Sequence, residues 1–150
     1  MAVRLRALEP EDVELVSRWL GAEHVRRWWG DPETNARILS QAPQGARHAV
    51  IEADGRPVGL VLCQHPSRAE LEAAGLADVP ETVVDLDVMV GDEGATGRGV
   101  GCEAIRLAAE AALADPSVPF VTAAVHVLND RSLRAVAKAG FEKEREFDDP

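Results

Sequence analysis

The stretch VVDLDVMVGDEGATGRGVGCEAI, residues 83–105, constrains the fold more than any other part of the chain. Residues 83–90 are rich in valine and alternate in polarity, which predicts a strand. Glycines follow at 97, 99 and 101, and the alanine-rich segment 100–114 predicts a helix. Because glycine lets backbone N–H groups approach a ligand and a helix N-terminus adds partial positive charge, this order predicts an anion site, most naturally for phosphates. A glycine-rich turn that only packs gives the same spacing.

Two common phosphate-binding motifs fit this stretch poorly. A P-loop requires GxxxxGK[ST], and the chain contains no Gly-Lys-Ser or Gly-Lys-Thr. Gly99–Ala104 spells GxGxxA, as in dinucleotide-binding folds, but these glycines do not follow the strand directly and no acidic residue stands at the ribose position. A dinucleotide-binding protein therefore stays as a weaker alternative.

Charge and composition narrow the class of ligand. Sixteen Lys and Arg against 26 Asp and Glu give a net charge of −10, which disfavours nucleic-acid binding. The same charge suits a cationic small molecule, although it also serves solubility. Apolar runs are too short for a membrane span and no signal peptide is evident, so we expect a cytoplasmic protein. The two cysteines and four histidines lack metal-ligand spacing, and we expect no metal.

The remaining pattern predicts a mixed α/β chain, with residues 1–150 as one domain. Asp54-Gly55 between two apolar runs predicts a hairpin within 48–64, and Pro10 with two acidic residues after it predicts a helix start. We expect the other strands at 3–8, 83–90, 118–127 and 141–147, and helices at 10–21, 24–29, 67–75, 100–114 and 131–140.

Three segments resemble the GCN5-related N-acetyltransferase (GNAT) superfamily. TGRGVGCEAI is similar to its acyl-CoA pyrophosphate loop, whose pattern is Arg/Gln-x-x-Gly-x-Gly/Ala. NDRSLRAVAKAGF matches its Asn-x-x-Ala…Lys-x-Gly-Phe segment, and WLGAEHVRRWWGDPE resembles the start of the aminoglycoside 6'-N-acetyltransferase and siderophore acyltransferase branch. The segments stand in the family's order and cover most of the chain. The resemblance implies a three-layer fold with a mixed, splayed central sheet flanked by helices.

The resemblance also implies acetyl-CoA as co-substrate. Main-chain groups near Met89 and Val90 would hold its pantetheine, and Asn129 would touch the coenzyme from the other side. Cys102 stands where the family often has serine or threonine, and we expect it to act as a small polar cap. The backbone amides implied for the pyrophosphate are those of Gly97, Arg98, Gly99, Val100, Gly101 and Cys102.

Asp85, Asp87 and Met89 share one face of the predicted strand, opposite a valine face that we expect in the core. Because unpartnered buried carboxylates are costly, we expect the aspartate face to be solvated or functional. An alkyl amine is mostly protonated at neutral pH and needs a base as it attacks. Asp87 stands at the offset from Gly97 at which the aminoglycoside branch carries its base. The resemblance thus implies Asp87 as general base, with Asp85 as a helper or substrate anchor.

Trp28 and Trp29 adjoin the expected acceptor side. Neighbouring helical residues point about 100° apart, so we expect one ring in the core and one lining the acceptor cleft. Both rings packing against the sheet is the alternative.

These features predict transfer of acetyl from acetyl-CoA to a primary amine of a small, cationic, aminoglycoside-like or polyamine-like acceptor. Two departures keep a non-catalytic acyl-CoA-binding or regulatory module as the alternative. Thr96 stands in place of the loop's first Arg/Gln, and Val136 in place of a tyrosine that often protonates the thiolate. The chain also ends where the family adds a strand. We therefore expect a sheet that is one strand short, a sheet completed by a partner such as the second copy of a homodimer, or a truncated chain.

Overall fold

The structure, a computed structural model, describes residues 2–40 and 47–147. Within these residues the centre is one five-stranded sheet in the order β1-β2-β3-β4-β5. Neighbouring strands are antiparallel except for the parallel pair β4–β5. The strands are β1 (Val3–Ala7), β2 (Arg47–Ala53), β3 (Arg56–Gln64), β4 (Val84–Val90) and β5 (Val121–Ala123).

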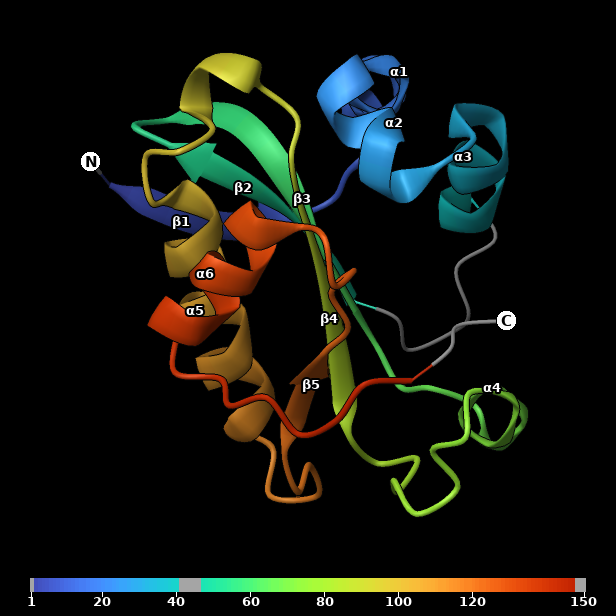
Figure 1. Cartoon of the computed structure of the whole chain (residues 1–150). Coiled ribbons are helices and arrows are strands. Elements are labelled where there is room, and N and C mark those ends of the chain that lie inside the picture. Colours follow the sequence, from blue (N-terminus) through green and yellow to red (C-terminus); the bar gives the residue numbers. More distant parts are fainter. Residues whose placement is uncertain (1, 41–46, 148–150) are drawn as a thin grey trace.

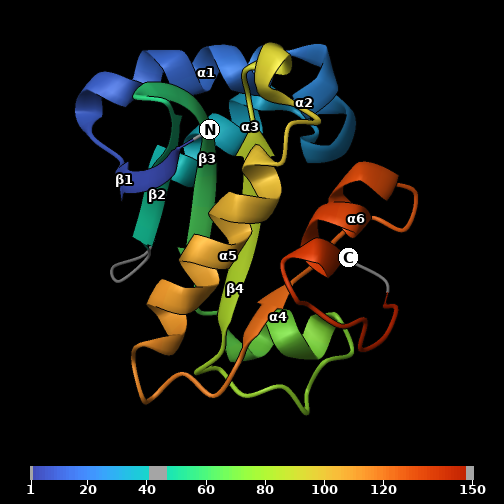
Figure 2. The ribbon, with the colours of Figure 1, turned by 90° about the vertical axis from the view of Figure 1, so that its left-hand side faces the viewer.

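Helices cover both faces of this sheet (Figure 1). The first face carries α1 (Val13–Gly21), α2 (Glu23–Trp29), α3 (Pro32–Ser40) and the short α4 (Arg68–Ala73). The second face carries α5 (Val100–Leu113) and α6 (Asp130–Lys138), and Figure 2 shows α5 crossing in front of the strands. Short 3-10 turns, Pro10–Asp12 and Glu93–Ala95, precede α1 and α5. The expected three-layer architecture is confirmed.

Each face of the sheet has its own hydrophobic core. On the first face, Trp19 and Leu20 of α1 pack with Leu60 of β3 and Met89 of β4. On the second face, Leu86 of β4 packs in a separate cluster with the apolar stripe of α5. Successive residues of a strand point to opposite faces, so β4 supplies both cores.

The expectation that the whole aspartate face of β4 is solvated or functional is wrong at its C-terminal end. Met89 is only 2% exposed and belongs to the core beneath α1 and α2. The sequence pattern shows which side chains share a face, but not that helices from the N-terminal third cover half of it.

Arg6 connects the first strand to the first helical turn. Its guanidinium donates two hydrogen bonds to Asp12, each 2.8 Å, and one to Glu52 on β2, also 2.8 Å. Both carboxyls are buried, and hydrogen bonds from arginine lower the pKa of each. Burial of these two carboxyls therefore costs little free energy, and the hydrogen bonds from Arg6 fix where α1 begins over the sheet.

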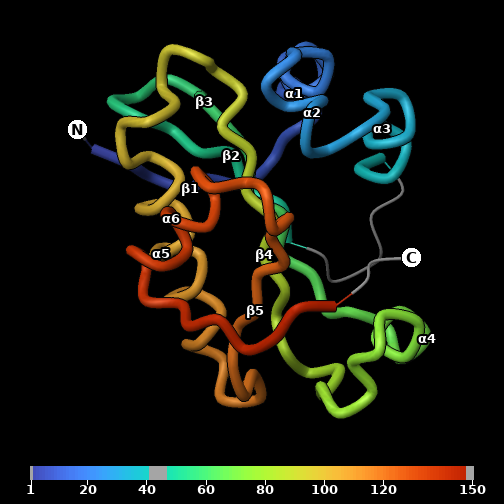
Figure 3. Tube along the Cα trace, in the orientation of Figure 1, coloured from blue at the N-terminus to red at the C-terminus, as the bar shows by residue number. Residues whose placement is uncertain are grey.

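Two predicted strands differ from the structure. Only Val121–Ala123 of the expected strand 118–127 pairs with β4, because the chain then turns away toward α6. The expected strand 141–147 is irregular: Phe141 packs on the second core, and the following residues are exposed. Figure 3 shows this segment running toward α4, in keeping with an ion pair of 2.6 Å between Arg145 and Asp78. Residues 148–150 lie outside the described part of the chain.

The sequence analysis missed α3. Asp31 accepts hydrogen bonds from the N–H and the hydroxyl of Thr34, at 2.9 and 2.7 Å, and Pro32 occupies the first helical position. An aspartate before a proline is a usual helix start, so the signal was present in GDPET. The predicted hairpin is confirmed, with Asp54 and Gly55 both at positive φ, 52° and 80°.

Gly91 allows α1 to pack closely against the end of β4. A Cβ placed on Gly91 would lie 2.0 Å from Cγ of Trp19, a side chain that is 6% exposed. No larger residue fits without moving α1, because that ring is enclosed by the first core.

We expect Gly91→Ala to lower the free energy of unfolding by about 2–3 kcal/mol, the usual cost of overpacking a filled core. Urea unfolding measures this difference. Gly21→Ala is the matched control, because a Cβ on Gly21, the last residue of α1, meets nothing within 4 Å. Equal stabilities for the two variants would contradict the conclusion that close packing of α1 requires glycine at position 91.

Candidate functional site

The edge of β4 becomes free where β5 leaves it. β5 pairs only with Val84–Leu86, and the N–H of Val84 donates to the carbonyl of Phe120 at 3.4 Å. Consecutive residues of a strand direct their main-chain groups to opposite edges, so Val88 and Val90 direct theirs toward the side that β5 has left. Met89 directs its main chain toward Leu60, its partner on β3. The expected splay of the sheet therefore begins after Leu86.

The glycine-rich loop leads from this free edge to the N-terminus of α5. Gly97 and Gly99 have φ of 75° and 81°, in the left-handed region where a side chain causes strain. Glu103 makes the first helical hydrogen bond, from its N–H to the carbonyl of Gly99 at 3.1 Å. The N–H groups of the three residues before Glu103 have no such carbonyl within the helix, which makes this end an anion site.

Other positions of the loop differ from expectation. Gly99 is the N-cap of α5, so Cys102 lies inside the first turn and is not the cap that we expected. The hydroxyl of Thr96 donates to the carbonyl of Glu93 at 2.6 Å and is thus occupied within the loop. Arg98 is exposed and forms no ion pair with any residue in the described ranges. The cradle therefore offers main-chain N–H groups and one free guanidinium.

Asp85 and Asp87 lie on the first face of β4, before the buried Met89. Both are partly exposed, and their register partners on β3 are Gln64 and Leu62. Oδ1 of Asp85 accepts a hydrogen bond of 2.8 Å from the hydroxyl of Thr122 on β5. The two carboxyls thus lie where β4 and β5 begin to separate, beside the free edge.

The carboxyl of Asp85 is electrostatically unusual. Its pKa is raised to about 7, mainly by burial and also by the negative charges of Asp87 and Glu70, while the hydrogen bond from Thr122 lowers it. Near neutral pH this group therefore gains and loses a proton, which an ordinary aspartate does not. Perturbed carboxyls of this kind are frequent at functional sites.

The two tryptophans divide as the helical spacing predicts. Trp29 packs against the first core. The Trp28 ring has its centroid 5.4 Å from the ring of His126, which lies between β5 and α6, and the Arg27 guanidinium sits 5.0 Å above Trp28. Trp28 thus reaches across the splay from α2 to the segment that follows β5.

His24 ties the other end of α2 to β4. Its Nε2 lies 2.9 Å from the carbonyl oxygen of Val90, and because a carbonyl only accepts, this nitrogen carries the proton. The second nitrogen, Nδ1, is buried without a hydrogen-bond partner within the described residues and lies 4.0 Å from the carboxylate of Glu93. Helix α2 therefore bridges the open end of the sheet through His24 and Trp28.

Asn129 lies beyond the splay, at the start of α6. Its Oδ1 accepts a hydrogen bond of 3.2 Å from the N–H of Ser132, so it is the N-cap of α6. Val136, on the same helix, packs on the second core. Sequence reasoning missed Val88, Thr122, His24 and His126; only the position of Val88 in the alternating strand signalled a role.

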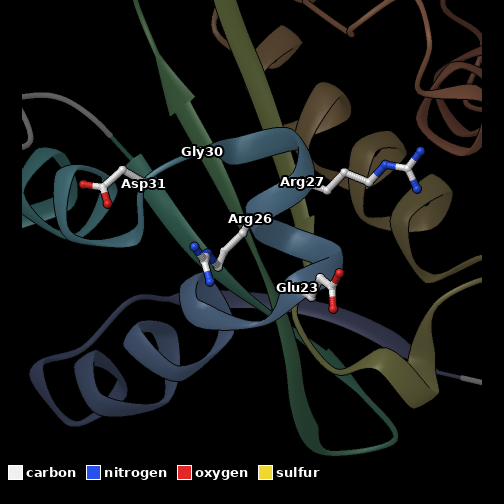
Figure 4. A pocket seen from close by; sticks show the side chains of 5 residues that line it. All are labelled: Glu23, Arg26, Arg27, Gly30 and Asp31. Atoms are coloured by element: carbon white, nitrogen blue, oxygen red, sulfur yellow. The ribbon is translucent and has the colours of Figure 1, made fainter.

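A depression in the surface lies elsewhere, on the outer side of α2 (Figure 4). In Figure 4 the side chains of Arg26 and Arg27 point in different directions and do not converge on one ligand. The depression contains neither of the two aspartates of β4. Its lining residues are Glu23, Arg26, Arg27, Gly30 and Asp31.

Residues 2–40 and 47–147 contain no group of three or more His, Cys, Asp or Glu side chains placed to hold a metal ion. No helix in these ranges is long and apolar enough to cross a bilayer.

The family model of the acetyltransferase (GNAT) domain matches residues 9–149. The chain belongs to this family. It is accordingly an acetyl-CoA-dependent N-acetyltransferase, with acetyl-CoA as co-substrate. The dinucleotide-binding alternative is wrong, because β4 is antiparallel to β3 and the sheet lacks the parallel order of that fold.

Known relatives and solved structures resemble this chain over most of its length. Aminoglycoside N(6')-acetyltransferase type 1 of Klebsiella pneumoniae is 24% identical over 152 residues, which cover 95% of this chain and 75% of the relative. The structure of the aminoglycoside acetyltransferase AAC(6')-Ib with coenzyme A superposes with a TM-score of 0.80 at 22% identity, covering 95% and 86% of the two chains. Spermidine N-acetyltransferase of Vibrio cholerae, bound to CoA and spermine, gives 0.73 at 18% identity, covering 99% and 88%.

We expect Asp85→Asn to stabilise the protein at pH 8. The folded state raises the pKa of Asp85 from 3.8 to about 7, so folding binds a proton more tightly and the free energy of unfolding falls as pH rises through this range. Asparagine does not ionise and accepts the same hydrogen bond from Thr122. The variant should gain about 2–4 kcal/mol at pH 8 and little below pH 4. Urea unfolding at both pH values checks this, and a pH-independent difference would contradict it.

Proposed function

We propose that this acetyltransferase acts on a primary amine of a small cationic acceptor, of the aminoglycoside-like or polyamine-like class. The observation that carries the proposal is the free edge of β4, which lies next to the glycine cradle and has Asp87 beside it. The net charge of −10 and the ligands bound in the structural neighbours, aminoglycosides and spermine, support a cationic acceptor.

The coenzyme is proposed to enter between the glycine loop and α6. Main-chain groups of Val88 and the N–H of Val90, whose carbonyl oxygen is bonded to His24, hold the pantetheine, with Met89 packed beneath them, and Asn129 contacts the coenzyme from the α6 side. The left-handed glycines and the unpaired N–H groups of α5 support this placement. The backbone amides proposed for the pyrophosphate are those of Gly97, Arg98, Gly99, Val100, Gly101 and Cys102.

Asp87 is proposed as the general base of a direct attack. Its carboxylate removes a proton from the acceptor amine as the nitrogen bonds to the thioester carbon, and the N–H of Val88, at the free edge, stabilises the oxyanion. Asp87 lies on the first face while the main chain of Val88 lies at the edge, so the base faces the attacking amine and the N–H of Val88 faces the thioester oxygen. The coenzyme leaves as thiolate or is protonated by water, since the chain contains no tyrosine.

The acceptor is proposed to lie under α2, between Trp28 and the aspartates. The Trp28 ring supplies an apolar and π-rich wall, and Asp85 anchors a second positive group of the acceptor when ionised. The contact between Trp28 and His126 spans the entrance, so acceptor binding displaces or widens it.

Asp87→Asn should lower kcat for amine acetylation by about 100-fold or more, because a positioned base contributes at least this factor. Release of coenzyme A thiol from acetyl-CoA, across a panel of aminoglycosides and polyamines, measures the rate. Glu93→Gln is the matched control, since Glu93 is an exposed carboxyl in the loop after β4. Turnover that survives Asp87→Asn removes Asp87 from the mechanism. Tight coenzyme binding without turnover on any amine of the panel would contradict the proposed acceptor class.

Trp28→Ala should raise KM for the acceptor about tenfold, as loss of one aromatic wall predicts, and leave KM for acetyl-CoA within about twofold. Steady-state kinetics with each substrate varied in turn separates the two constants. Trp29→Phe provides the control, because Trp29 belongs to the core. A rise confined to the KM of acetyl-CoA would place Trp28 on the coenzyme side.

A further inference from the structure

We propose that Asp85, oriented by the Thr122 hydroxyl, is a positioning residue for proton transfer. The carboxyl of Asp85 takes up the second proton that the acceptor amine releases, and this proton reaches it through Asp87 or a bound water. The inference rests on the proposed function, because it concerns the same reaction. It differs from the role of Asp85 as an ammonium anchor, since the carboxyl here stores a proton.

The proton balance of the reaction requires two acceptors. A primary amine arrives as an ammonium with three hydrogens on nitrogen, whereas the amide product keeps one. Formation of the C–N bond and cleavage of the C–S bond therefore release two protons and a thiolate. Asp87 holds one proton at a time. The chain has no tyrosine to exchange a proton with the thiolate, so a second group near Asp87 is needed to accept the other proton.

The geometry places Asp85 where this task arises. Asp85 and Asp87 are on the same face of β4, with their Cα atoms about 7 Å apart, a gap that one water or the acceptor nitrogen spans. The hydrogen bond of 2.8 Å from Thr122 fixes one oxygen of Asp85 at the last part of the sheet where β5 still pairs with β4. Beyond that pair the strands splay, so Asp85 lies at the inner end of the proposed cleft.

The surroundings of Asp85 suit reversible protonation. The negative groups that raise its pKa are Asp87, on the same strand, and Glu70, on α4; its neighbour on β3 is the uncharged Gln64, and that on β5 is Thr122. Together with burial they bring the pKa to about 7. A proton acceptor works best when its pKa lies near the operating pH, and an ordinary aspartate lies well below it.

The test compares pH profiles of kcat for the wild type, Asp85→Asn, Thr122→Val and Thr122→Ser. The wild type should show an inflection near pH 7 that Asp85→Asn lacks. At pH 8, kcat of Asp85→Asn should be about tenfold lower than that of the wild type, which corresponds to about one pKa unit in the affinity of the proton acceptor. The acceptor's own titration is common to all variants and cancels in the comparison. In the wild type the hydrogen bond from Thr122 lowers the pKa of Asp85. Thr122→Val removes this bond and should therefore move the inflection to higher pH, and Thr122→Ser should return the inflection to its wild-type position.

Glu70→Gln is the matched control for a change of charge at this place. Glu70 is exposed and raises the pKa of Asp85, so the variant should keep kcat at pH 8 and move the inflection to lower pH. Carbon-13 NMR titration of the aspartate carboxyls gives a readout that does not depend on turnover. One carboxyl should titrate near pH 7 in the wild type and be missing in Asp85→Asn.

The outcomes separate this inference from the proposed function. If the wild type acetylates an amine and Asp85→Asn keeps both its rate and its inflection, the proton-transfer role is overturned while the proposed function stands. A uniformly scaled profile in Asp85→Asn shows a structural role and also overturns it. If no carboxyl titrates near pH 7, the inference fails whatever the rates. If neither the wild type nor any variant acetylates an amine, the proposed function fails and the inference with it.

Discussion

The separation of β5 from β4 after Leu86 is the constraint on which the site depends. A fully paired β4 would have its main-chain groups occupied at both edges, and no extended ligand could join the sheet there. Because pairing stops after three residues, Val88 and Val90 offer main-chain groups at an edge whose far end opens into the glycine loop. The same separation leaves a gap that α2 bridges through His24 and Trp28.

The site joins two opposite electrostatic environments within one strand and loop. The cradle at α5 attracts anions mainly through backbone N–H groups, so it does not need a cluster of cationic side chains in a protein of net charge −10. The face of β4 beneath α2 carries Asp85 and Asp87 and favours cations. The partial burial of Asp85 disfavours its ionised form, and such local conflicts between stability and ionisation are typical of functional sites.

Much of the fold could be predicted from local sequence patterns. The hairpin at Asp54-Gly55, β4 and α5 are specified by turn chemistry, alternation and helix propensity, which act over neighbouring residues. The irregular course of residues 141–147 could not be predicted in this way, because a strand needs a neighbour and β5 is short. Thr122 and His126 were missed for a related reason: their contacts join segments far apart in sequence, and nothing local marks them.

The division of the interior into two cores has a consequence for how such a chain can diversify. The helices on the first face and those on the second face pack into separate clusters, and the sheet lies between them. Free-energy effects of substitutions that share no contacts are nearly additive. Residues of α1 and α3 can therefore be exchanged without a compensating change around α5, whereas His24 and Trp28 of α2 contact Val90 and His126 and cannot.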